Sequence, residues 1–249
     1  MHRLPTDTDS LGNGVAALSR EAAAHLRALR PEKGERFELF DGKGAWRVYE
    51  YDGAALVAAG PVERCGRPET RLALFACITK GSRWDWTIEK ATELGADLVV
   101  PVISERTIVR IGRDERNAKL ARWRRIAEDA ARQSDAKWIP EIMPATDFHK
   151  AAELASEHMT FVGAITTPPA PPLLEAVAAA RPQAGATLAA FIGPEGDFTP
   201  EELDALVKVA RPASFGPSVL RAETAAIYAI GVLAAARDAI VGKEGNAWS

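Results

Sequence analysis

The sequence predicts an α/β domain with a mostly parallel sheet, preceded by a small β-barrel. The first part of the chain has short polar-apolar alternations joined by glycine turns, which are typical of a small barrel. The remainder has continuous apolar runs that alternate with helical patterns, as in α/β proteins with a parallel sheet. We therefore expect two domains, at 1–68 and 69–249.

The N-terminal part is expected to contain a short helix followed by strands. The helix is expected at 25–29, and the strands at 36–40, 45–50 and 54–59. Asp41-Gly42 is a strong turn signal between the first two strands. The polar segment 62–71, which contains Gly66 and Pro68, is interpreted as a linker between the two domains.

The rest of the chain alternates between buried strands and amphipathic helices. Segment 72–78 is apolar throughout, which indicates a strand buried on both faces of a sheet. Further strands are expected at 98–103, 139–143, 159–165 and 187–192. Helices are expected at 84–94, 118–133, 173–180 and 200–209, and a long alanine-rich helix ends the pattern.

The composition is typical of a soluble globular protein, with 47% hydrophobic and 26% charged residues. No apolar stretch is long enough to span a membrane, and the polar N-terminus lacks the apolar core of a signal peptide, so a cytoplasmic location is expected. The two cysteines, Cys65 and Cys77, are too few for a disulfide framework or a structural zinc site. We expect both to be buried, inert thiols.

Several classes of enzyme are disfavoured because their motifs are missing. The sequence has no glycine-rich dinucleotide fingerprint, no P-loop lysine and no G-x-S-x-G elbow. The four histidines are scattered, and no histidine or cysteine cluster has the spacing of a metal site. The sequence therefore argues against a dehydrogenase, an NTPase, a serine hydrolase or a metalloenzyme, and no metal is expected.

Basic residues are concentrated in one region of a mildly acidic chain. The net charge is −3, yet eight arginines and lysines lie between Arg106 and Arg125, against Asp114 and Glu115. Such a stripe can hold a phosphate backbone, although on charge alone a solvated helix face is the more common explanation. The candidates for nucleic-acid contact are Arg106, Arg122, Arg124 and Arg125.

A glycine-rich loop follows the strand expected at 187–192 and leads into a helix. Thr199 is a good N-cap for that helix, and Pro200 suits its first position. Ligands of open parallel sheets bind at the carboxyl ends of strands, and Gly193 and Gly196 let the backbone approach a ligand closely. The same spacing also fits a tight strand-to-helix turn that binds nothing, so the spacing leaves both interpretations open.

A second glycine-proline loop, Gly216-Pro217, precedes the long C-terminal helix. Arg221 and Glu223 lie where this loop joins the helix. They fit a ligand site, but they also fit a helix start with a capping pair and a solvent-exposed arginine.

Taken together, these segments resemble the knotted SPOUT class of methyltransferases, and within it the family that methylates N3 of a uridine in 16S ribosomal RNA (RsmE type). The run Ile192-Gly193-Pro194-Glu195-Gly196 looks like the cofactor loop of that family, and Gly216-Pro217-x-Val219-Leu220-Arg221-x-Glu223-Thr224-Ala225 looks like its C-terminal motif. Segments 87–95 and 101–106 are similar to further family segments, and 25–34 and 39–42 look like its PUA-like barrel. The resemblance covers nearly the whole chain.

The resemblance implies a trefoil-knotted α/β domain that acts as a homodimer, preceded by a PUA-like, RNA-binding barrel. Periodicity alone would never justify predicting a knot, because true knots are so rare. The implied cofactor is S-adenosyl-L-methionine, and the implied partner is 16S rRNA or the small ribosomal subunit, with no membrane. The implied cofactor-binding residues are Ile192, Gly193, Pro194, Glu195, Gly196, Phe215, Gly216, Val219, Leu220, Thr224 and Ala225.

Two residues are candidates for catalysis in such an enzyme. Uridine N3 is a poor nucleophile until it loses its proton, so a fixed cation beside the uracil oxygens would stabilise the developing charge. Arg221 is the candidate for this cation. Glu195 is expected to orient the uracil, to orient the cofactor amine, or to help remove the proton, and these three roles remain open.

The sequence departs from the family pattern in three places. Ser218 stands where the family usually has Arg, the run at 132–136 keeps a Gln but not its flanking Glu and Arg, and the expected Arg-x-Phe is not evident around Arg3. These changes touch expected RNA contacts and leave the cofactor loops intact. They keep two alternatives open: a related methyltransferase acting on another rRNA or tRNA site, and a catalytically silent RNA-binding protein for ribosome assembly.

Overall fold

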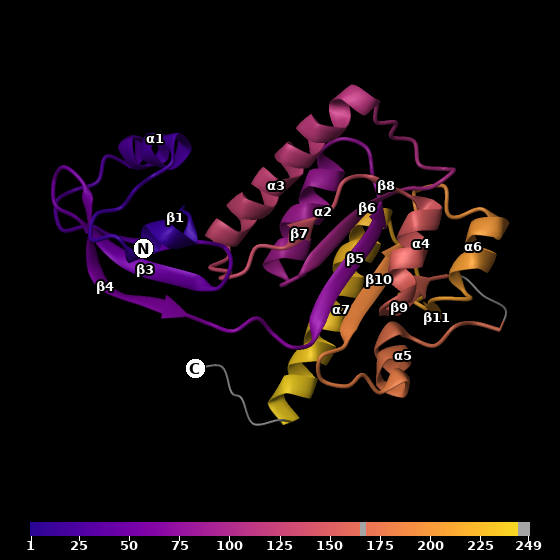
Figure 1. Cartoon of the computed structure of the whole chain (residues 1–249). Helices are drawn as coiled ribbons and strands as arrows, with labels where there is room; N and C mark the ends of the chain where they lie inside the picture. The colour runs from indigo at the N-terminus through magenta and orange to yellow at the C-terminus, as the bar shows by residue number, and fades with distance from the viewer. Residues whose placement is uncertain (165–167, 244–249) are drawn as a thin grey trace. The chain divides into compact units, whose positions relative to one another are not determined.

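The computed structural model describes residues 1–164 and 168–243 and divides into two compact units (Figure 1). The first unit consists of Met1–Arg67 and Glu128–Ile139, and the second of Pro68–Ala127 and the chain from Pro140 onward. The helix α3 (Arg116–Gln133) therefore contributes to both units. The sequence patterns did not indicate that a segment from the middle of the chain returns to the first unit.

The first unit is built on a four-stranded sheet with the order β1-β2-β3-β4. Its elements are β1 (His2–Pro5), the 3-10 helix η1 (Thr8–Gly12), α1 (Arg20–Leu29), β2 (Arg36–Phe40), β3 (Ala45–Tyr51) and β4 (Leu56–Arg64). The first pair of strands is parallel and the other two pairs are antiparallel. Phe37, Leu39 and Tyr49 are fully buried in its core. The closure of this sheet into a barrel stays a prediction.

Arg3 joins the returning segment to this sheet. Its buried guanidinium donates hydrogen bonds to Glu38 at 2.8 Å and to the carbonyl oxygens of Ala131 and Ala136 at 2.7 and 3.0 Å. Lys137 donates to the same carboxylate at 2.7 Å. The buried carboxylate of Glu38 is thus paired with two cations that come from opposite ends of this unit's sequence. This pairing offsets the free-energy cost of burying its charge.

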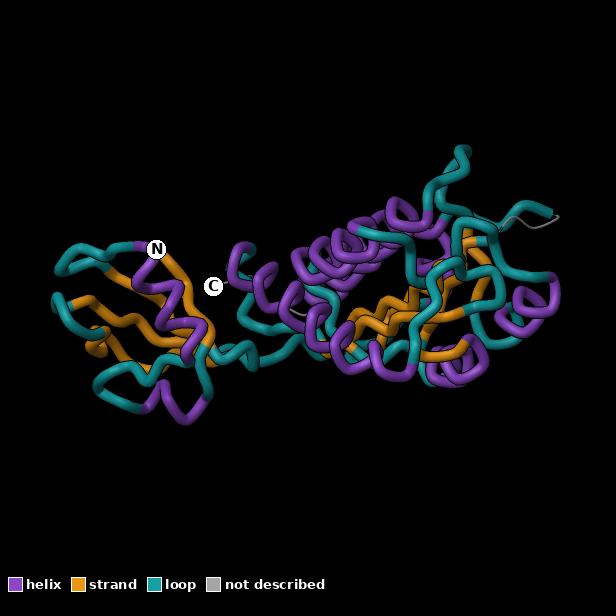
Figure 2. Tube along the Cα trace, turned by 90° about the horizontal axis from the view of Figure 1, so that it is seen from above, coloured by secondary structure: helices purple, strands orange, loops and turns teal. Residues whose placement is uncertain are grey.

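The second unit is a parallel sheet with the order β11-β9-β10-β5-β6-β7, and β8 also pairs with β6. Its strands are β5 (Arg71–Cys77), β6 (Leu98–Ile103), β7 (Glu141–Ile142), β8 (Thr146–Asp147), β9 (Met159–Gly163), β10 (Thr187–Ile192) and β11 (Arg211–Ala213). Its helical elements besides α3 are α2 (Ser82–Glu93), the 3-10 helix η2 (Arg113–Glu115), α4 (Phe148–Ser156), α5 (Leu173–Ala180), α6 (Pro200–Leu206) and α7 (Ala222–Lys243). Every strand pair in the described part of this sheet is parallel, which confirms the expected α/β class (Figure 1). Figure 2 shows the helices and strands of this unit in a second view.

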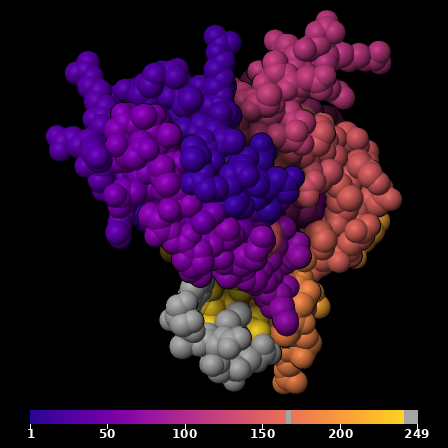
Figure 3. All heavy atoms as spheres, turned by 60° about the vertical axis from the view of Figure 1, so that its left-hand side comes forward, coloured from indigo at the N-terminus to yellow at the C-terminus, as the bar shows by residue number. Residues whose placement is uncertain are grey.

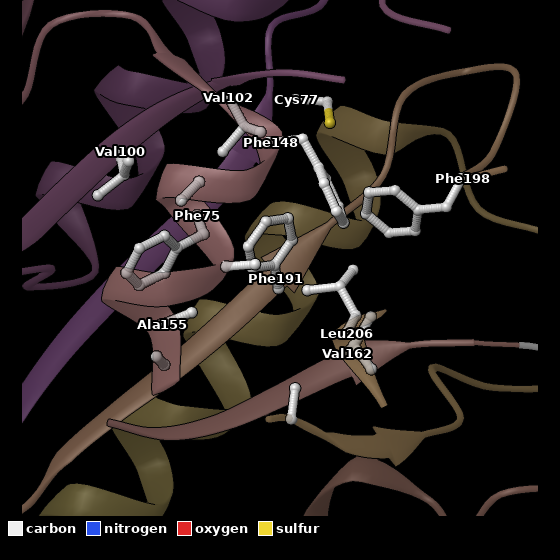
Figure 4. Packing of buried hydrophobic residues seen from close by; sticks show 14 of the residues in the cluster. Phe75, Cys77, Val100, Val102, Phe148, Ala155, Val162, Phe191, Phe198 and Leu206 are labelled. Carbon is white, nitrogen blue, oxygen red and sulfur yellow. The ribbon is translucent and has the colours of Figure 1, made fainter. Parts of the chain in front are cut away.

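Both faces of the central strands are buried. Phe75 of β5 and Phe191 of β10 stack with their ring centroids 5.6 Å apart, and Phe148 and Phe198 pack against the same face (Figure 4). Because side chains alternate along a strand, the buried Leu72 and Leu74 point to the other face, where α7 lies against β5 and β10. Burial on both faces explains why these strands are apolar throughout.

The expected linker at 62–71 is wrong in its bounds. β4 continues to Arg64 and β5 already begins at Arg71, so the connection between them is much shorter. Most side chains of β4 are exposed or half-buried, and a solvated strand of this kind accepts polar residues as readily as a linker does. The expected strand at 159–165 ends at Gly163, and Ile165 lies outside the described residues.

Several short elements were not predicted, among them α4, β1 and β11. Helix α4 buries Phe148, Ala151 and Ala155 on one face, and its N-cap is Asp147. Its small alanines gave a weak hydrophobic pattern, although their spacing is helical. Strand β1 pairs with β2, and β11 lies at the edge of the large sheet, where its proline is tolerated because no ladder hydrogen bond is needed on the outer side.

Candidate functional site

The first candidate loop leaves the carboxyl end of β10, a central strand. The backbone turns sharply after Ile192, and the N–H of Asp197 donates to the carbonyl oxygen of Pro194 at 3.0 Å. A Cβ atom on Gly193 would lie 3.1 Å from the Phe198 ring, so glycine lets the loop pack directly on that ring. Glu195 and Gly196, at the tip of the turn, are exposed.

Helix α6 fixes the far end of this loop. Thr199 accepts a hydrogen bond from the N–H of Glu202 at 3.2 Å, and the Glu202 carboxylate accepts one from the N–H of Thr199 at 3.0 Å. This reciprocal capping box, with Pro200 in the first turn, confirms the expected helix start. The loop is therefore held between a central strand and a capped helix.

The segment after β6 clamps the loop from the side. The N–H of Glu105 donates to the second oxygen of Glu202 at 2.9 Å. The guanidinium of Arg106 donates to the carbonyl oxygens of Gly196 and Phe198 at 3.0 and 3.3 Å. Arg106 was expected to contact nucleic acid, and its intramolecular partners give it a role in holding the loop as well.

The second candidate loop connects β11 to α7. The ring of Phe215 packs against Gly163 so closely that a Cβ atom on this glycine would lie 2.6 Å from the ring. The centroids of the Phe215 and Tyr228 rings are 5.8 Å apart. Gly216 has φ of 116°, a conformation that other residues rarely adopt. Val219 is 89% exposed and is therefore available for contact with another molecule.

The start of α7 packs closely against the sheet. Ala225 and Ala226 are buried, and these small side chains let the helix approach β5 and β10. Thr224 is exposed and Leu220 is half-buried. Arg221, immediately before the helix, is exposed, and its side chain makes no hydrogen bond or ion pair within the described part of the chain.

Arg83 brings the two candidate loops together. It lies in the first turn of α2, after the carboxyl end of β5, which is the strand next to β10. Its Nη1 is 3.6 Å from Glu195 Oε1 in the first loop, and its Nε is 3.9 Å from Glu223 Oε1 at the start of α7. Sequence reasoning missed Arg83, although its position after a buried strand places it at the edge of the sheet where ligands bind.

Glu223 is the buried member of this group. Its side chain is 8% exposed, against 26% for Glu195 and 47% for Arg83. Its second oxygen, Oε2, is buried and has no hydrogen-bond partner. Leaving a buried carboxylate oxygen without a hydrogen bond is costly, so this atom, which lies between the two candidate loops, indicates a place for a hydrogen-bond donor from a ligand.

The comparisons with known proteins identify the family. A model of the RNA methyltransferase domain matches residues 67–234. The chain belongs to this RNA methyltransferase family. A protein named ribosomal RNA small subunit methyltransferase E from Synechocystis sp. is 32% identical, over 92% of this chain and 76% of its own length. The protein of that name from Mycobacterium tuberculosis is 32% identical, over 85% of this chain and 81% of its own length.

Solved structures of related methyltransferases have the same fold. The ribosomal RNA small subunit methyltransferase E from Neisseria gonorrhoeae, bound to S-adenosyl methionine, superimposes with a TM-score of 0.81 at 26% identity, over 95% of this chain and 98% of that chain. A methyltransferase from Legionella pneumophila in complex with the same cofactor gives a TM-score of 0.79 at 29% identity, over 94% of this chain and 97% of that chain. The family expected from the two sequence motifs is confirmed.

The basic residues of α3 lie on the surface of this RNA methyltransferase. Arg122, Arg124 and Arg125 are exposed, and Arg122 forms an ion pair with Asp85. Long side chains project into solvent from the pink part of the chain in the space-filling view, which includes the start of α3 (Figure 3). A charged surface of this kind is compatible with an RNA backbone and with a solvated helix face.

Three further findings concern groups outside the two loops. Burial raises the pKa of the Cys77 thiol to about 12, whereas Cys65 is only half-buried, so the expectation of two buried cysteines is wrong for Cys65. Among residues 1–164 and 168–243, no three histidine, cysteine or acidic side chains are grouped as a metal would require. No helix in these residues combines the length and apolar character needed to cross a membrane.

Proposed function

We propose that this RNA methyltransferase transfers a methyl group from S-adenosyl-L-methionine to N3 of a uridine in 16S ribosomal RNA. The observation that carries the proposal is the meeting of the two motif loops at the carboxyl edge of β10 and β5, bridged by Arg83. The relatives named ribosomal RNA small subunit methyltransferase E, which align with most of the chain, support the same substrate class.

The residues present fit the cofactor. Gly216 leaves open space beside an exposed backbone, and Glu223 has a buried oxygen that lacks a donor. When bound, S-adenosylmethionine supplies an electrophilic methyl group attached to a sulfonium. The residues proposed to hold it are Ile192, Gly193, Pro194, Glu195, Gly196, Phe215, Gly216, Val219, Leu220, Thr224 and Ala225. Among the apolar residues of this set, Ile192 and Leu220 are proposed to flank the adenine.

Arg221 is proposed to stabilise the negative charge that develops on the uracil oxygens. Its guanidinium is exposed and has no protein partner in the described residues, so it is free to meet the acceptor base. A fixed cation that stabilises developing charge contributes several kcal/mol to catalysis, about 2.7–4 for a single donor. With both ligands bound, the chain would also align N3 with the methyl group, and alignment of this kind lowers barriers by roughly 7–11 kcal/mol.

Glu195 is proposed to act by orienting a substrate. The ion pair with Arg83 restricts its carboxylate at the tip of the first loop. A carboxylate that is already held by a guanidinium suits orientation of the uracil or of the cofactor better than a mobile role in proton transfer. We therefore assign Glu195 to positioning and leave proton removal to solvent or to the RNA itself.

The division at 1–68 and 69–249 is proposed to separate RNA binding from methyl transfer. The N-terminal part would form a PUA-like barrel, and Arg106, Arg122, Arg124 and Arg125 would extend the RNA-binding surface on the second domain. The trefoil knot and the homodimer, both implied by the resemblance to SPOUT enzymes, belong to the same proposal. A protein with this substrate would act in the cytoplasm, where ribosomes are assembled.

Mapping of modified uridines by mass spectrometry tests the proposed function. Ribosomal RNA from cells that lack the protein is expected to lose one N3-methyluridine, and re-expression is expected to restore it. Loss of a modification elsewhere in rRNA or in tRNA would point to a related methyltransferase with another target. An unchanged RNA together with no binding of S-adenosylmethionine in calorimetry would indicate a catalytically silent ribosome-assembly protein.

A further inference from the structure

Glu223 differs from the buried carboxylate of Glu202 in the number of its oxygens that accept a hydrogen bond or form an ion pair within the protein. Glu202 is also buried, and its two oxygens accept hydrogen bonds from the N–H groups of Glu105 and Thr199 at 2.9 and 3.0 Å. The Oε2 atom of Glu223 has no partner in the described part of the chain. The other buried polar atoms without partners there belong to threonines and tryptophans, so only that of Glu223 is on an ionisable group.

The charges around Glu223 are not balanced. The guanidinium of Arg83 faces two carboxylates, at 3.6 Å from Glu195 and at 3.9 Å from Glu223. Arg83 is also half-exposed, so water screens the charge of its guanidinium more strongly than it screens the charge of the buried Glu223 carboxylate. The ion-paired group of Arg83, Glu195 and Glu223 thus has one positive and two negative side chains, and this excess of carboxylates favours a cationic ligand beside Glu223.

We propose that Glu223 binds the α-ammonium group of the methionine portion of the cofactor through Oε2. This inference rests on the proposed function. Glu223 lies in the first turn of α7, directly after the second cofactor loop, and Arg83 links it to the first loop. An ammonium supplies both the N–H donor that Oε2 lacks and the positive charge that the site lacks.

The acceptor base is a poorer ligand for the same oxygen. The N3–H group of uracil is neutral, and it becomes anionic when it reacts. An anion beside a buried carboxylate would be repelled, which would raise the barrier rather than lower it. The geometry therefore points to the cofactor, and a role toward uracil becomes an outcome of the test.

Calorimetry with two ligands tests the proposal on the full-length protein. The ligands are S-adenosylhomocysteine and its deaminated analogue, which lacks only the α-amino group. A charge-assisted hydrogen bond of the usual strength predicts that the unmodified protein binds the amine-bearing ligand about tenfold to a hundredfold more tightly. In Glu223→Gln, this preference is expected to shrink to a few-fold at most, because the amide keeps the shape and loses the charge.

Glu202→Gln is the matched control. It removes the charge of another buried carboxylate whose oxygens are both satisfied within the protein. Because Glu202 also holds the first loop, this variant is expected to lower the midpoint of thermal unfolding and to weaken binding of both ligands to the same extent, so that the preference for the amine-bearing ligand stays unchanged. Glu223→Asp provides a second variant if Glu223→Gln does not fold. It keeps the negative charge but shortens the side chain by one methylene group, so we expect a preference for the amine-bearing ligand between those of the unmodified protein and Glu223→Gln.

The outcomes separate the inference from the proposed function. If the unmodified protein binds neither ligand, the proposed function fails. If it binds them and Glu223→Gln keeps the full preference, the proposed function stands and the inference is overturned. An equal loss of affinity for both ligands would mean that Glu223 only supports the loop or the start of α7, which also overturns it. The inference is likewise overturned if Glu223→Gln keeps the preference for the amine-bearing ligand while its turnover with RNA falls, because Glu223 would then interact with the acceptor base and not with the cofactor.

Discussion

At the scale of single residues, the site combines Arg221 with a group of three ion-paired side chains. Arg221 faces solvent without a protein partner in the described residues, whereas Arg83 is shared by Glu195 and Glu223. The two arginines therefore have different tasks. The partnered arginine organises the site, and the unpartnered arginine is available for the acceptor.

Replacement of Arg221 by alanine is expected to remove most of the methyl transfer and to leave cofactor affinity nearly unchanged. The loss of a fixed cation beside the uracil oxygens predicts a fall in turnover of about 10²–10³-fold. Single-turnover kinetics and calorimetry with S-adenosylmethionine measure the two quantities. Arg211→Ala, which removes an exposed arginine of β11, serves as the control, and full turnover in Arg221→Ala would exclude that residue from the mechanism.

Cys77 is expected to stay unreactive in the folded protein. Burial raises the pKa of its thiol from 9.0 to about 12, so at pH 8 a thiol reagent should label Cys65 quickly and Cys77 only after unfolding. The raised pKa contributes stability that is fully present below pH 9 and is lost as the pH rises from 9 toward 12. Cys77→Ala should therefore lose less stability across this interval than the unmodified protein, as measured by denaturant unfolding. Equal losses would contradict the expectation.

At the scale of elements, each candidate loop is held in place by contacts with the segments around it. Arg106 and Glu202 fix the first loop from the segment after β6 and from α6. The second loop is fixed by Phe215, whose ring fills the space that a side chain on Gly163 would need. Each loop is therefore as rigid as the elements that it contacts, and this rigidity is what a preformed ligand site needs.

Arg106→Ala is expected to weaken cofactor binding by loosening the first loop. Two hydrogen bonds to the carbonyl oxygens of Gly196 and Phe198 are lost, and we expect a fall in cofactor affinity of about tenfold. Calorimetry in the absence of RNA isolates this effect. Arg113→Ala, in the same basic region, is the control and should bind the cofactor normally. If Arg106→Ala changed only the affinity for RNA, the residue would be an RNA contact and not a clamp.

Gly163→Ala tests the packing under the second loop. The new Cβ atom would come within 2.6 Å of the Phe215 ring, so the ring and its loop must move. Overpacking of this kind costs about 1–3 kcal/mol of stability, and the displaced loop should bind S-adenosylmethionine more weakly. Thermal unfolding and calorimetry measure both effects. Gly66→Ala is the control, because no atom lies within 4 Å of the added Cβ atom, and it should change neither the stability nor the cofactor affinity. If Gly163→Ala binds the cofactor normally, Phe215 has no part in the cofactor site.

At the scale of the whole molecule, the sequence predicted the parallel sheet better than it predicted the site. Strands such as β5 and β10 are buried on both faces, so their apolar runs were readily recognised. Arg83 could not be recognised from the sequence, because no local pattern distinguishes an arginine that forms part of a site from a solvent-exposed arginine in the first turn of a helix. Only the order of strands places it between Glu195 and Glu223. The return of 128–139 to the first unit depends likewise on contacts between residues distant in the sequence, because Arg3 donates to the carbonyl oxygens of Ala131 and Ala136 and Lys137 donates to Glu38.

The basic surface provides a test of how the whole molecule binds RNA. Replacement of Arg122, Arg124 and Arg125 by alanine is expected to weaken binding of an rRNA fragment and to reduce its dependence on salt. If each arginine neutralises one phosphate, the slope of log affinity against log salt should become shallower by about 2–3. Binding is measured over a series of salt concentrations by fluorescence anisotropy.

The control for this experiment removes the same charge elsewhere on the second unit. Lys150, Lys208 and Arg211 are exposed and lie outside the basic region, so their replacement by alanine lowers the net charge equally. Because long-range attraction depends on net charge, a part of the affinity should be lost in both triple variants. Only the loss of direct phosphate contacts should make the slope shallower in the first variant than in the second. Equal slopes in the two variants would mean that the arginines of α3 form a solvated face, and that the RNA is held by other surfaces of the protein.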